Sequence, residues 1–197
     1  MTQVDAVITA GGIPKPGEPL YPFTQGKNKA LLDVAGKPMV QWVLDALSAS
    51  DRVRRVVIVG LDKDARLNYP SPLGYVPNQG EMLANIRAGV NWVKKQDASA
   101  RYVLVVSSDI PAITPESVNW LVDTALQTDH ELYYTVVPQQ TMEKRFPASK
   151  RTYTKLKGLT VCGGDMNFAQ ADVVASETGL WGQIIAARKS PLKQASI

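Results

Sequence analysis

The chain has 197 residues and a mass of 21.5 kDa, with 45% apolar and 20% charged residues, 14 glycines and 13 prolines. This length suits one globular domain that folds without a disulfide or a metal, and the composition excludes a disordered or low-complexity chain. The net charge of +4 is unevenly distributed: six basic residues and one acidic residue between positions 141 and 160 give that stretch a charge of +5.

The single cysteine, Cys162, has no partner for an intrachain disulfide, and we expect it to be a small buried apolar residue. No apolar stretch approaches the roughly 18 residues of a membrane-spanning helix, and the first residues do not resemble a signal peptide. The lone histidine, His130, is expected on a surface loop. These features predict a cytoplasmic protein with no membrane partner.

The first two thirds of the chain alternate between strand-like and helix-like segments. Short β-branched runs predict buried strands at residues 4–10, 55–60 and 102–106. Apolar residues at helical spacing predict helices over residues 38–47 and 80–95, and Thr114 before Pro115 predicts the start of a third helix. This order is typical of an α/β fold, and we expect a three-layer α/β/α sandwich with a mostly parallel sheet.

Past Asp129 the pattern changes. Residues 132–138 and 153–162 read as strands with the basic stretch between them and no long helix, which predicts a late antiparallel element. Residues 172–193 read as a helix that is interrupted near Gly179 and Gly182. The sequence stops at Ile197 without a helix-capping residue, and whether it is truncated there is left open. We expect one domain over residues 1–197.

Ligands of open parallel sheets bind at the carboxyl ends of the strands, so the loops there are the expected site. The first strand leads into Ala10-Gly11-Gly12, where paired glycines let backbone N–H groups approach a phosphate, although they also suit a plain tight turn. Neither G-x-G-x-x-G nor the Walker motif G-x-x-x-x-G-K-[ST] occurs. Their absence argues against dinucleotide redox chemistry and against a P-loop kinase.

Residues 28–39 read NKALLDVAGKPM. Together with the preceding Ala-Gly-Gly, they resemble the signature of the GT-A-type nucleotidyltransferases, in which a glycine loop is followed by Lys-x-Leu and then by Gly-Lys-Pro-Met at a helix start. Ser108-Asp109-Ile110-Pro111 is similar to the Asp-x-Pro motif of the subgroup that contains molybdenum-cofactor guanylyltransferase. The resemblance extends from residue 4 to about residue 122.

The resemblance implies that Ala10, Gly11 and Gly12 bind the nucleotide, that Lys29 neutralises the reacting phosphates, and that Asp109 holds Mg²⁺. Nucleotidyl transfer depends on positioning and charge neutralisation, and an anionic phosphate nucleophile needs no general base. The structural alternatives are a solvated loop lysine at position 29 and a helix-start carboxylate at position 109. Many relatives carry an arginine after the glycines, and here Lys15 or Lys27 would replace it.

Further site residues are expected in three other segments. Relatives place a metal-binding Asn late in the chain, and Asn167 matches that placement, with Asp165 as the other candidate metal ligand. Both lie in what reads as a glycine-rich turn after the late strand, where capping of a helix is the alternative role. Relatives read the base where Asn78, Gln79 and Gly80 precede a helix, and a plain helix N-terminus is the alternative for this segment. The basic stretch is expected to bind the acceptor phosphate or to be only a solvated loop. Its candidate residues are Lys144, Arg145, Lys150 and Arg151.

We therefore expect a Mg²⁺-dependent nucleotidyltransferase that transfers NMP from an NTP to a small phosphorylated acceptor and releases pyrophosphate. Residues 1–128 would bind the NTP and residues 129–197 the acceptor. One alternative is a glycosyltransferase that uses a nucleotide sugar, although Ser107-Ser108-Asp109 lacks the first carboxylate of an Asp-x-Asp motif. Another is a non-catalytic nucleotide sensor. Whether the protein forms a homodimer is left open. Nucleic acid is not expected as a partner, because the basic stretch forms no helical basic face that would favour it over a small anionic substrate.

Overall fold

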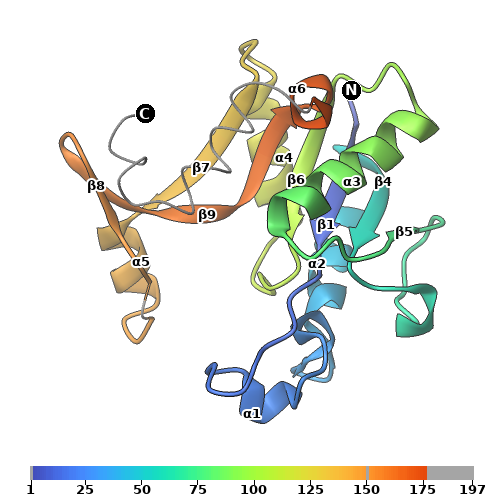
Figure 1. The fold of residues 1–197 in the computed structure, drawn as a ribbon. Helices are drawn as coiled ribbons and strands as arrows, with labels where there is room; N and C mark the ends of the chain where they lie inside the picture. Colours follow the sequence, from blue (N-terminus) through green and yellow to red (C-terminus); the bar gives the residue numbers. More distant parts are fainter. Residues whose placement is uncertain (1, 150, 177–197) are drawn as a thin grey trace.

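The computed structural model describes residues 2–149 and 151–176. A central sheet has the strand order β5-β4-β1-β6-β9-β7, with β8 paired to β9 (Figure 1). Strands β5, β4, β1 and β6 run parallel, whereas β9 is antiparallel to both β6 and β7. The strands of this sheet are β1 Val4–Thr9, β4 Val53–Val59, β5 Gly74–Val76, β6 Tyr102–Ser107, β7 Leu132–Pro138, β8 Thr154–Leu156 and β9 Leu159–Gln170.

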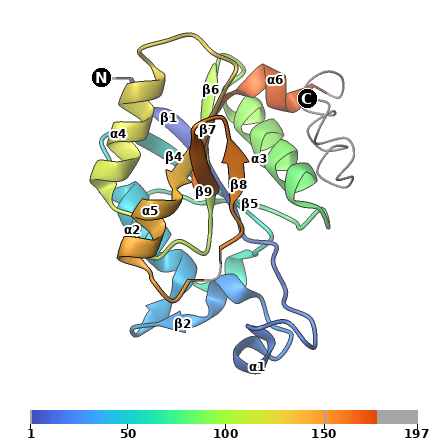
Figure 2. The ribbon, with the colours of Figure 1, turned by 90° about the vertical axis from the view of Figure 1, so that its left-hand side faces the viewer.

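Helices cover both faces of the sheet, which confirms the predicted three layers. Figure 2 shows the sheet nearly edge-on, with α2 and α4 on one side and α3 and α6 on the other. Each side has its own apolar core, because the central strands are buried on both faces. The α-helices are α1 Tyr21–Thr24, α2 Met39–Ser48, α3 Met82–Gln96, α4 Pro115–Ala125, α5 Gln139–Arg145 and α6 Ala171–Ala175.

The predicted start of α4 is correct in detail. The Thr114 hydroxyl accepts a hydrogen bond from the Ser117 amide at 3.3 Å, and the Ser117 hydroxyl accepts one from the Thr114 amide at 3.2 Å. This capping box satisfies two amides at the start of the helix, and Pro115 occupies a position that needs no N–H. The buried stripe of α4 then faces the same core as α2.

The Gly-Lys-Pro-Met motif forms a small hairpin before α2. Strand β2 (Asp33–Val34) pairs with β3 (Lys37–Pro38) across a tight turn, and α2 begins at the next residue. The Lys37 ammonium lies 3.6 Å from the centre of the Trp42 ring and forms an ion pair with Asp45. This motif lysine therefore holds the hairpin against α2.

The predicted late antiparallel element is confirmed by β7 and β9, but the second strand has other bounds than predicted. The strand expected over residues 153–162 is a hairpin, because the chain turns between β8 and β9, and β9 then continues to Gln170. The basic stretch between β7 and β8 contains the short helix α5. Of the predicted helix 172–193, α6 covers the first residues; residues 177–197, with Gly179, Gly182 and Ile197, lie outside the described residues.

Two smaller expectations are also resolved. Cys162 is buried in β9 and His130 is exposed, as predicted. Within residues 2–149 and 151–176, no helix combines the length and the apolarity that crossing a bilayer requires.

Candidate functional site

The loops that leave β1 and β4 touch backbone to backbone. Gly60 has φ +104°, and a Cβ at this position would lie 2.5 Å from the Cα and from the amide N of Gly11. Only glycine fits both this conformation and this approach. The glycine pair after β1 is therefore packed against the neighbouring loop, which is more than a plain tight turn requires.

Asn28 joins these two loops and was not singled out from the sequence. Its side-chain amide donates hydrogen bonds to the carbonyl oxygens of Ala10 at 2.5 Å and of Gly60 at 3.1 Å. Its side-chain oxygen accepts a hydrogen bond from the Ala30 amide at 2.9 Å, which caps the 3₁₀ turn η1 (Lys29–Leu31). Asn28 thus fixes the position of Lys29 beneath both loops, and the only sequence signal was a capping residue before Lys-x-Leu.

Lys29 and Asp109, the two predicted catalytic residues, are in direct contact although 80 positions separate them. The Lys29 backbone amide bonds to the Gly12 carbonyl at 3.0 Å, and its side chain runs past Gly12, where a Cβ would lie 2.6 Å from Lys29 Cε. Its Nζ lies 2.5 Å from Asp109 Oδ2, and both side chains are 30% exposed. Lys29 is therefore not a solvated loop lysine.

Asp109 lies at the carboxyl end of β6, six positions before α4 begins, so it does not act as a helix-start carboxylate. Burial opposes its ionisation, but hydrogen bonds from Lys29 and from the Ser107 hydroxyl outweigh this cost and hold the pKa of Asp109 below its ordinary value. The site thus presents an ionised carboxylate at neutral pH.

The described residues contain no group of three or more His, Cys, Asp or Glu side chains arranged to hold a metal. Asp109 supplies one carboxylate at a position fixed by β6. Magnesium is usually bound through one or two carboxylates and completes its shell with water and substrate phosphates. The donor set at Asp109 therefore fits a Mg²⁺ ion that arrives with a triphosphate.

The predicted loop around Asp165 and Asn167 is wrong, because both residues lie inside β9. The Asn167 side-chain oxygen accepts a hydrogen bond from the backbone amide of Thr135 at 3.0 Å, within the irregular pairing of β7 and β9. Packing requires the second of the glycines before it: a Cβ at Gly164 would lie 2.1 Å from the Thr135 hydroxyl and 2.9 Å from Thr135 Cβ. A Cβ at Gly163 would lie 2.5 Å from the hydroxyl of Tyr134, an exposed side chain. These glycines make room for β7, and they are not a turn signal.

Asn78 lies against the glycine loop and is hydrogen-bonded to the segment that contains Gln79 and Gly80. The Asn78 side-chain amide donates to the Gly11 carbonyl at 3.0 Å, and its side-chain oxygen accepts from the Gly80 amide at 3.0 Å. The backbone N–H of Gln79 donates a hydrogen bond to the side-chain oxygen of Asn85 on α3 at 2.6 Å. Sequence reasoning missed Asn85, whose only signal is a polar residue next to the apolar stripe of a predicted helix.

The predicted acceptor residues that the structure describes lie on different elements and have different contacts. Lys144 and Arg145 are exposed in the last turn of α5, and Lys150 lies outside the described residues. Arg151 instead reaches β9, where its guanidinium donates to the Gly163 carbonyl at 2.7 Å and lies 3.3 Å from Asp165 Oδ2. Because Met166 pairs with Val106 of β6, this part of β9 lies beside the carboxyl end of β6.

A cavity of about 750 Å³ borders the same edge of the sheet. Its lining combines the loops after β4 and β5 with Ile13 of the glycine loop, and it shares Asn28, Gly60 and Asn78 with the contacts described above. Lys15, predicted to bind the nucleotide, is exposed on the glycine loop outside this lining. The carboxyl edge therefore joins a glycine loop, a Lys–Asp pair and a cavity.

Comparisons with known proteins are consistent with this arrangement. The family model described as "MobA-like NTP transferase domain" matches residues 6–171. A hypothetical transferase from Thermus thermophilus has a known structure that superposes with a TM-score of 0.79 at 32% identity, over 99% of this chain and 77% of that one. The bifunctional protein GlmU of Rhodospirillum rubrum is 30% identical over 129 residues. That alignment covers 66% of this chain but only 27% of the length of GlmU.

Two more distant structures share the fold. CMP:2-keto-3-deoxy-manno-octonic acid synthetase, solved in complex with CTP, superposes with a TM-score of 0.65 at 18% identity, over 100% of this chain and 87% of that one. The 4-diphosphocytidyl-2C-methyl-D-erythritol synthase of Anaerococcus prevotii superposes with a TM-score of 0.61 at 15% identity, over 95% of this chain and 83% of that one. These TM-scores show that the chain shares the fold of these two proteins.

Proposed function

The chain belongs to the family of MobA-like NTP transferase domains, and on that premise we propose that it transfers a nucleotidyl group from an NTP to a small phosphorylated acceptor. The observation that carries this proposal is the Lys29–Asp109 pair, held under the glycine loop at the carboxyl edge of the sheet. A cation and a carboxylate at one fixed point suit a reaction that depends on positioning and on neutralising phosphate charge.

The proposed reaction is a displacement at the α-phosphorus of the NTP. A phosphate oxygen of the acceptor forms the new bond to phosphorus, and the bond to the bridging oxygen breaks, so that pyrophosphate leaves with the electron pair. Nothing is oxidised or reduced. The acceptor phosphate is already anionic at neutral pH, and therefore the proposed step needs no general base.

Each residue then has a separate task. Gly11 and Gly12 let the triphosphate approach the backbone, and Lys29 exchanges Asp109 for a phosphate oxygen as its partner. Asp109 is left to hold Mg²⁺, which, when bound, neutralises charge on the triphosphate. Asn28 keeps Lys29 beneath the loop through its bonds to Ala10 and Gly60.

The acceptor phosphate is assigned to Arg151. This is the described candidate of the basic stretch that is tied to β9, next to the carboxyl end of β6. A guanidinium can contact two oxygens of one phosphate, and Asp165 and the Gly163 carbonyl orient it. Asp165 is accordingly proposed as the partner of Arg151 and no longer as a metal ligand.

The test begins with binding. Each of the four NTPs is added with Mg²⁺, and the unfolding temperature is measured, because a ligand that binds only the folded state raises it. Pyrophosphate release is then assayed with the stabilising NTP and a panel of small phosphorylated compounds. We expect one NTP to stabilise the protein and to be consumed with at least one acceptor.

Two other results would contradict the proposal. Stabilisation by a nucleotide sugar, with release of its sugar and not of pyrophosphate, would identify a glycosyltransferase. Stabilisation by an NTP without turnover, unchanged by Asp109→Asn, would identify a nucleotide sensor in which Asp109 has no role.

A further inference from the structure

Helix α3 contains a buried polar residue at the end nearest the candidate site. Asn85 is 5% exposed, and it lies next to the apolar residues Ile86 and Val90, which pack on the sheet. Burying a side-chain amide costs free energy unless its donors and acceptors are satisfied. The position of Asn85 therefore calls for a reason beyond packing.

The Asn85 side chain forms hydrogen bonds to the segment that precedes the helix. The Asn85 side-chain oxygen accepts a hydrogen bond from the backbone N–H of Gln79 at 2.6 Å, and its side-chain nitrogen donates one to Asn78 Oδ1 at 3.0 Å. Asn78 in turn accepts from the Gly80 amide at 3.0 Å and donates to the Gly11 carbonyl at 3.0 Å. One continuous network thus connects α3, the segment 78–80 and the glycine loop.

The contact between the two loops leaves no free space. A Cβ at Gly11 would lie 2.7 Å from Asn78 Oδ1 and 2.8 Å from Asn85 Nδ2. The glycine loop is therefore seated directly on the two amides. Moving either amide changes the separation of the segments that would enclose a nucleotide.

The network also determines which groups can read a base. The backbone N–H groups of Gln79 and Gly80 are already bonded to the two asparagines. Gln79 is exposed, but its side-chain nitrogen donates a hydrogen bond to the Pro77 carbonyl at 2.6 Å. The side-chain oxygen of Gln79 and the carbonyl oxygens of residues 78–80 are therefore the groups that would face a ligand. Their directions follow from the backbone that Asn85 holds.

We propose that Asn85 is a positioning residue that sets base specificity at the NTP site, through Asn78 and the backbone of Gln79 and Gly80. The inference rests on the proposed function, because it requires that an NTP binds between these segments. Asn85 does not touch the ligand. Its removal changes the geometry of the groups that do.

The experiment compares three variants with the wild type: Asn85→Ala, Asn78→Ala and the double variant. Dissociation constants for the four NTPs with Mg²⁺ are measured by calorimetry well below the unfolding temperature of each protein. We expect Asn85→Ala to weaken binding of the preferred NTP about tenfold, which is the effect of losing one buried hydrogen-bonded group. The ratio between the affinities for the preferred NTP and for the other three NTPs should become smaller. The double variant should resemble the single ones, because both residues act through the same network.

Gln41 provides a matched control. It is a buried amide, 7% exposed, on α2, and it bonds to the backbone nitrogen of Asn68 at 2.9 Å and to its oxygen at 2.8 Å, so it also ties a helix to a loop. Gln41→Ala should lower the unfolding temperature as Asn85→Ala does, but it should leave the ratios of NTP affinities unchanged.

The outcomes separate the inference from the proposed function. If the wild type binds no NTP, both are overturned. If it binds an NTP but Asn85→Ala and Asn78→Ala keep the wild-type ratios among the bases, only the role of Asn85 is overturned. Asn78 is exposed, so its variant gives this answer even if Asn85→Ala does not fold.

Discussion

Lys29 and Asp109 satisfy each other's charge at the carboxyl edge of the sheet. The proposed function assigns each of them a new partner, phosphate for Lys29 and Mg²⁺ for Asp109. Ligand binding must therefore exchange one ion pair for two new interactions. This makes nucleotide and metal binding interdependent, because each ligand releases the group that the other needs.

The Lys29→Ala variant should show this exchange directly. Turnover should fall on the order of 10²-fold or more, as expected when one fixed charge at a transferring phosphate is lost. In contrast, Mn²⁺ added without nucleotide should bind several-fold more tightly than to the wild type, because Asp109 has lost its competing cation. Calorimetry measures the second effect, and unchanged Mn²⁺ affinity would show that the pair does not restrict the carboxylate.

Lys37→Ala is the matched control for this experiment. Lys37 is a motif lysine of similar exposure that also pairs with an aspartate, Asp45. Its contacts hold the β2–β3 hairpin, so turnover and Mn²⁺ binding should stay near the wild-type values.

Arg151 should contribute more to acceptor binding than the other described basic residues of its stretch. Arg151→Ala is expected to raise the KM of the acceptor several-fold with little change in the KM of the NTP, because uniform binding of one substrate is lost. Arg145→Ala, at an exposed position on α5, should have a smaller effect that fades with added salt. Equal effects of Arg151→Ala on both KM values would mean that Arg151 contacts the triphosphate instead.

At the scale of single elements, the close contact of α3 with the sheet is the feature that positions the candidate site. Gly89 faces β1 and β4, where a Cβ would lie 2.3 Å from Val7 Cγ1 and 3.0 Å from Val59 Cγ2. The missing side chain lets α3 lie close to the strands whose loops form the site. Glycine lowers the helix propensity at this position, but it allows the short distance between α3 and the sheet.

Gly89→Ala tests whether the gain in helix propensity or the clash of the new Cβ with the sheet is larger. Alanine favours a helix by about 1 kcal/mol over glycine. Overpacking against Val7 should outweigh this gain and lower the free energy of unfolding by about 1–3 kcal/mol. Asn91→Ala, on the exposed side of α3, should leave stability unchanged or slightly higher. Urea unfolding measures both, and a more stable Gly89→Ala variant would show that α3 can move away from the sheet.

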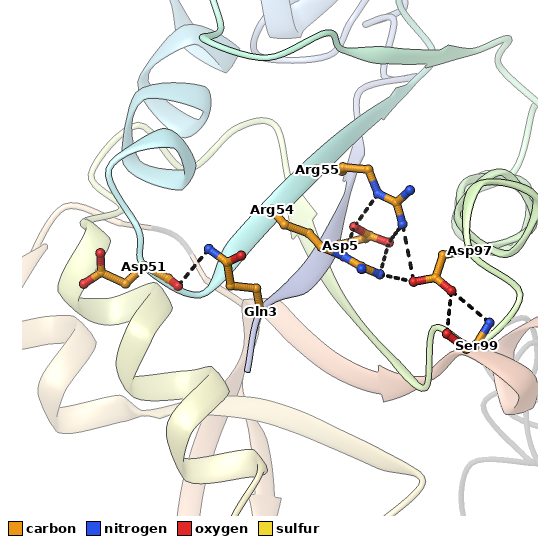
Figure 3. A network of polar contacts seen from close by, with 7 residues as sticks. All are labelled: Gln3, Asp5, Asp51, Arg54, Arg55, Asp97 and Ser99. Atoms are coloured by element: carbon orange, nitrogen blue, oxygen red, sulfur yellow. Dashed lines mark hydrogen bonds and ion pairs between the residues drawn. The ribbon is translucent and has the colours of Figure 1, made fainter. Parts of the chain in front are cut away.

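At the scale of the whole molecule, a second polar cluster lies at the amino ends of β1 and β4, opposite the candidate site. Figure 3 shows Asp5 between Arg54 and Arg55, with Asp97 and Ser99 beyond them. Both arginines reach Asp5, although they are consecutive, because the pairing of β1 and β4 is irregular at Asp5. The cluster ties β1, β4 and the end of α3 together at the end of the sheet that carries no predicted site residue.

Asp5→Asn should be costly because Asp5 is 1% exposed and is the shared partner of two guanidinium groups. We expect the free energy of unfolding to fall by about 3 kcal/mol, the low end for a broken buried ion pair, since both arginines stay partly exposed. Asp51→Asn provides the control. Asp51 lies in the same view, but it is exposed, and it accepts a hydrogen bond from the Gln3 side chain with its backbone oxygen, which the substitution keeps. Its substitution should change stability by less than about 0.5 kcal/mol.

The same cluster should limit stability in acid. Hydrogen bonds from Ser99 and Arg54 lower the pKa of Asp97 to about 2. Since the unfolded chain protonates this group near its ordinary value of 3.8, its contribution is complete above that pH and is lost as the pH falls toward 2. Stability measured against pH should therefore fall less steeply between pH 4 and 2 in Asp97→Asn than in the wild type. Parallel curves would assign the acid sensitivity to other carboxylates.

Several features of this protein were determined by contiguous residues alone. Strands β1, β4 and β6 follow from short β-branched runs, and the start of α4 follows from Thr114 and Pro115, because burial and capping act over a few neighbouring positions. The glycine loop follows from its place after the first strand, whereas Lys29 and Asp109 are indicated by the resemblance of short contiguous motifs to the nucleotidyltransferase signature.

Only the tertiary structure decided which of these residues meet. Lys29 reaches Asp109 across 80 positions, and Asn28 and Asn85 matter through bonds to loops that the sequence does not place beside them. The glycines of β9 resembled a turn because Thr135, whose side chain requires Gly164, lies on another strand. Long-range packing gives these residues their partners, and no local pattern of propensity or spacing encodes which partner each one receives.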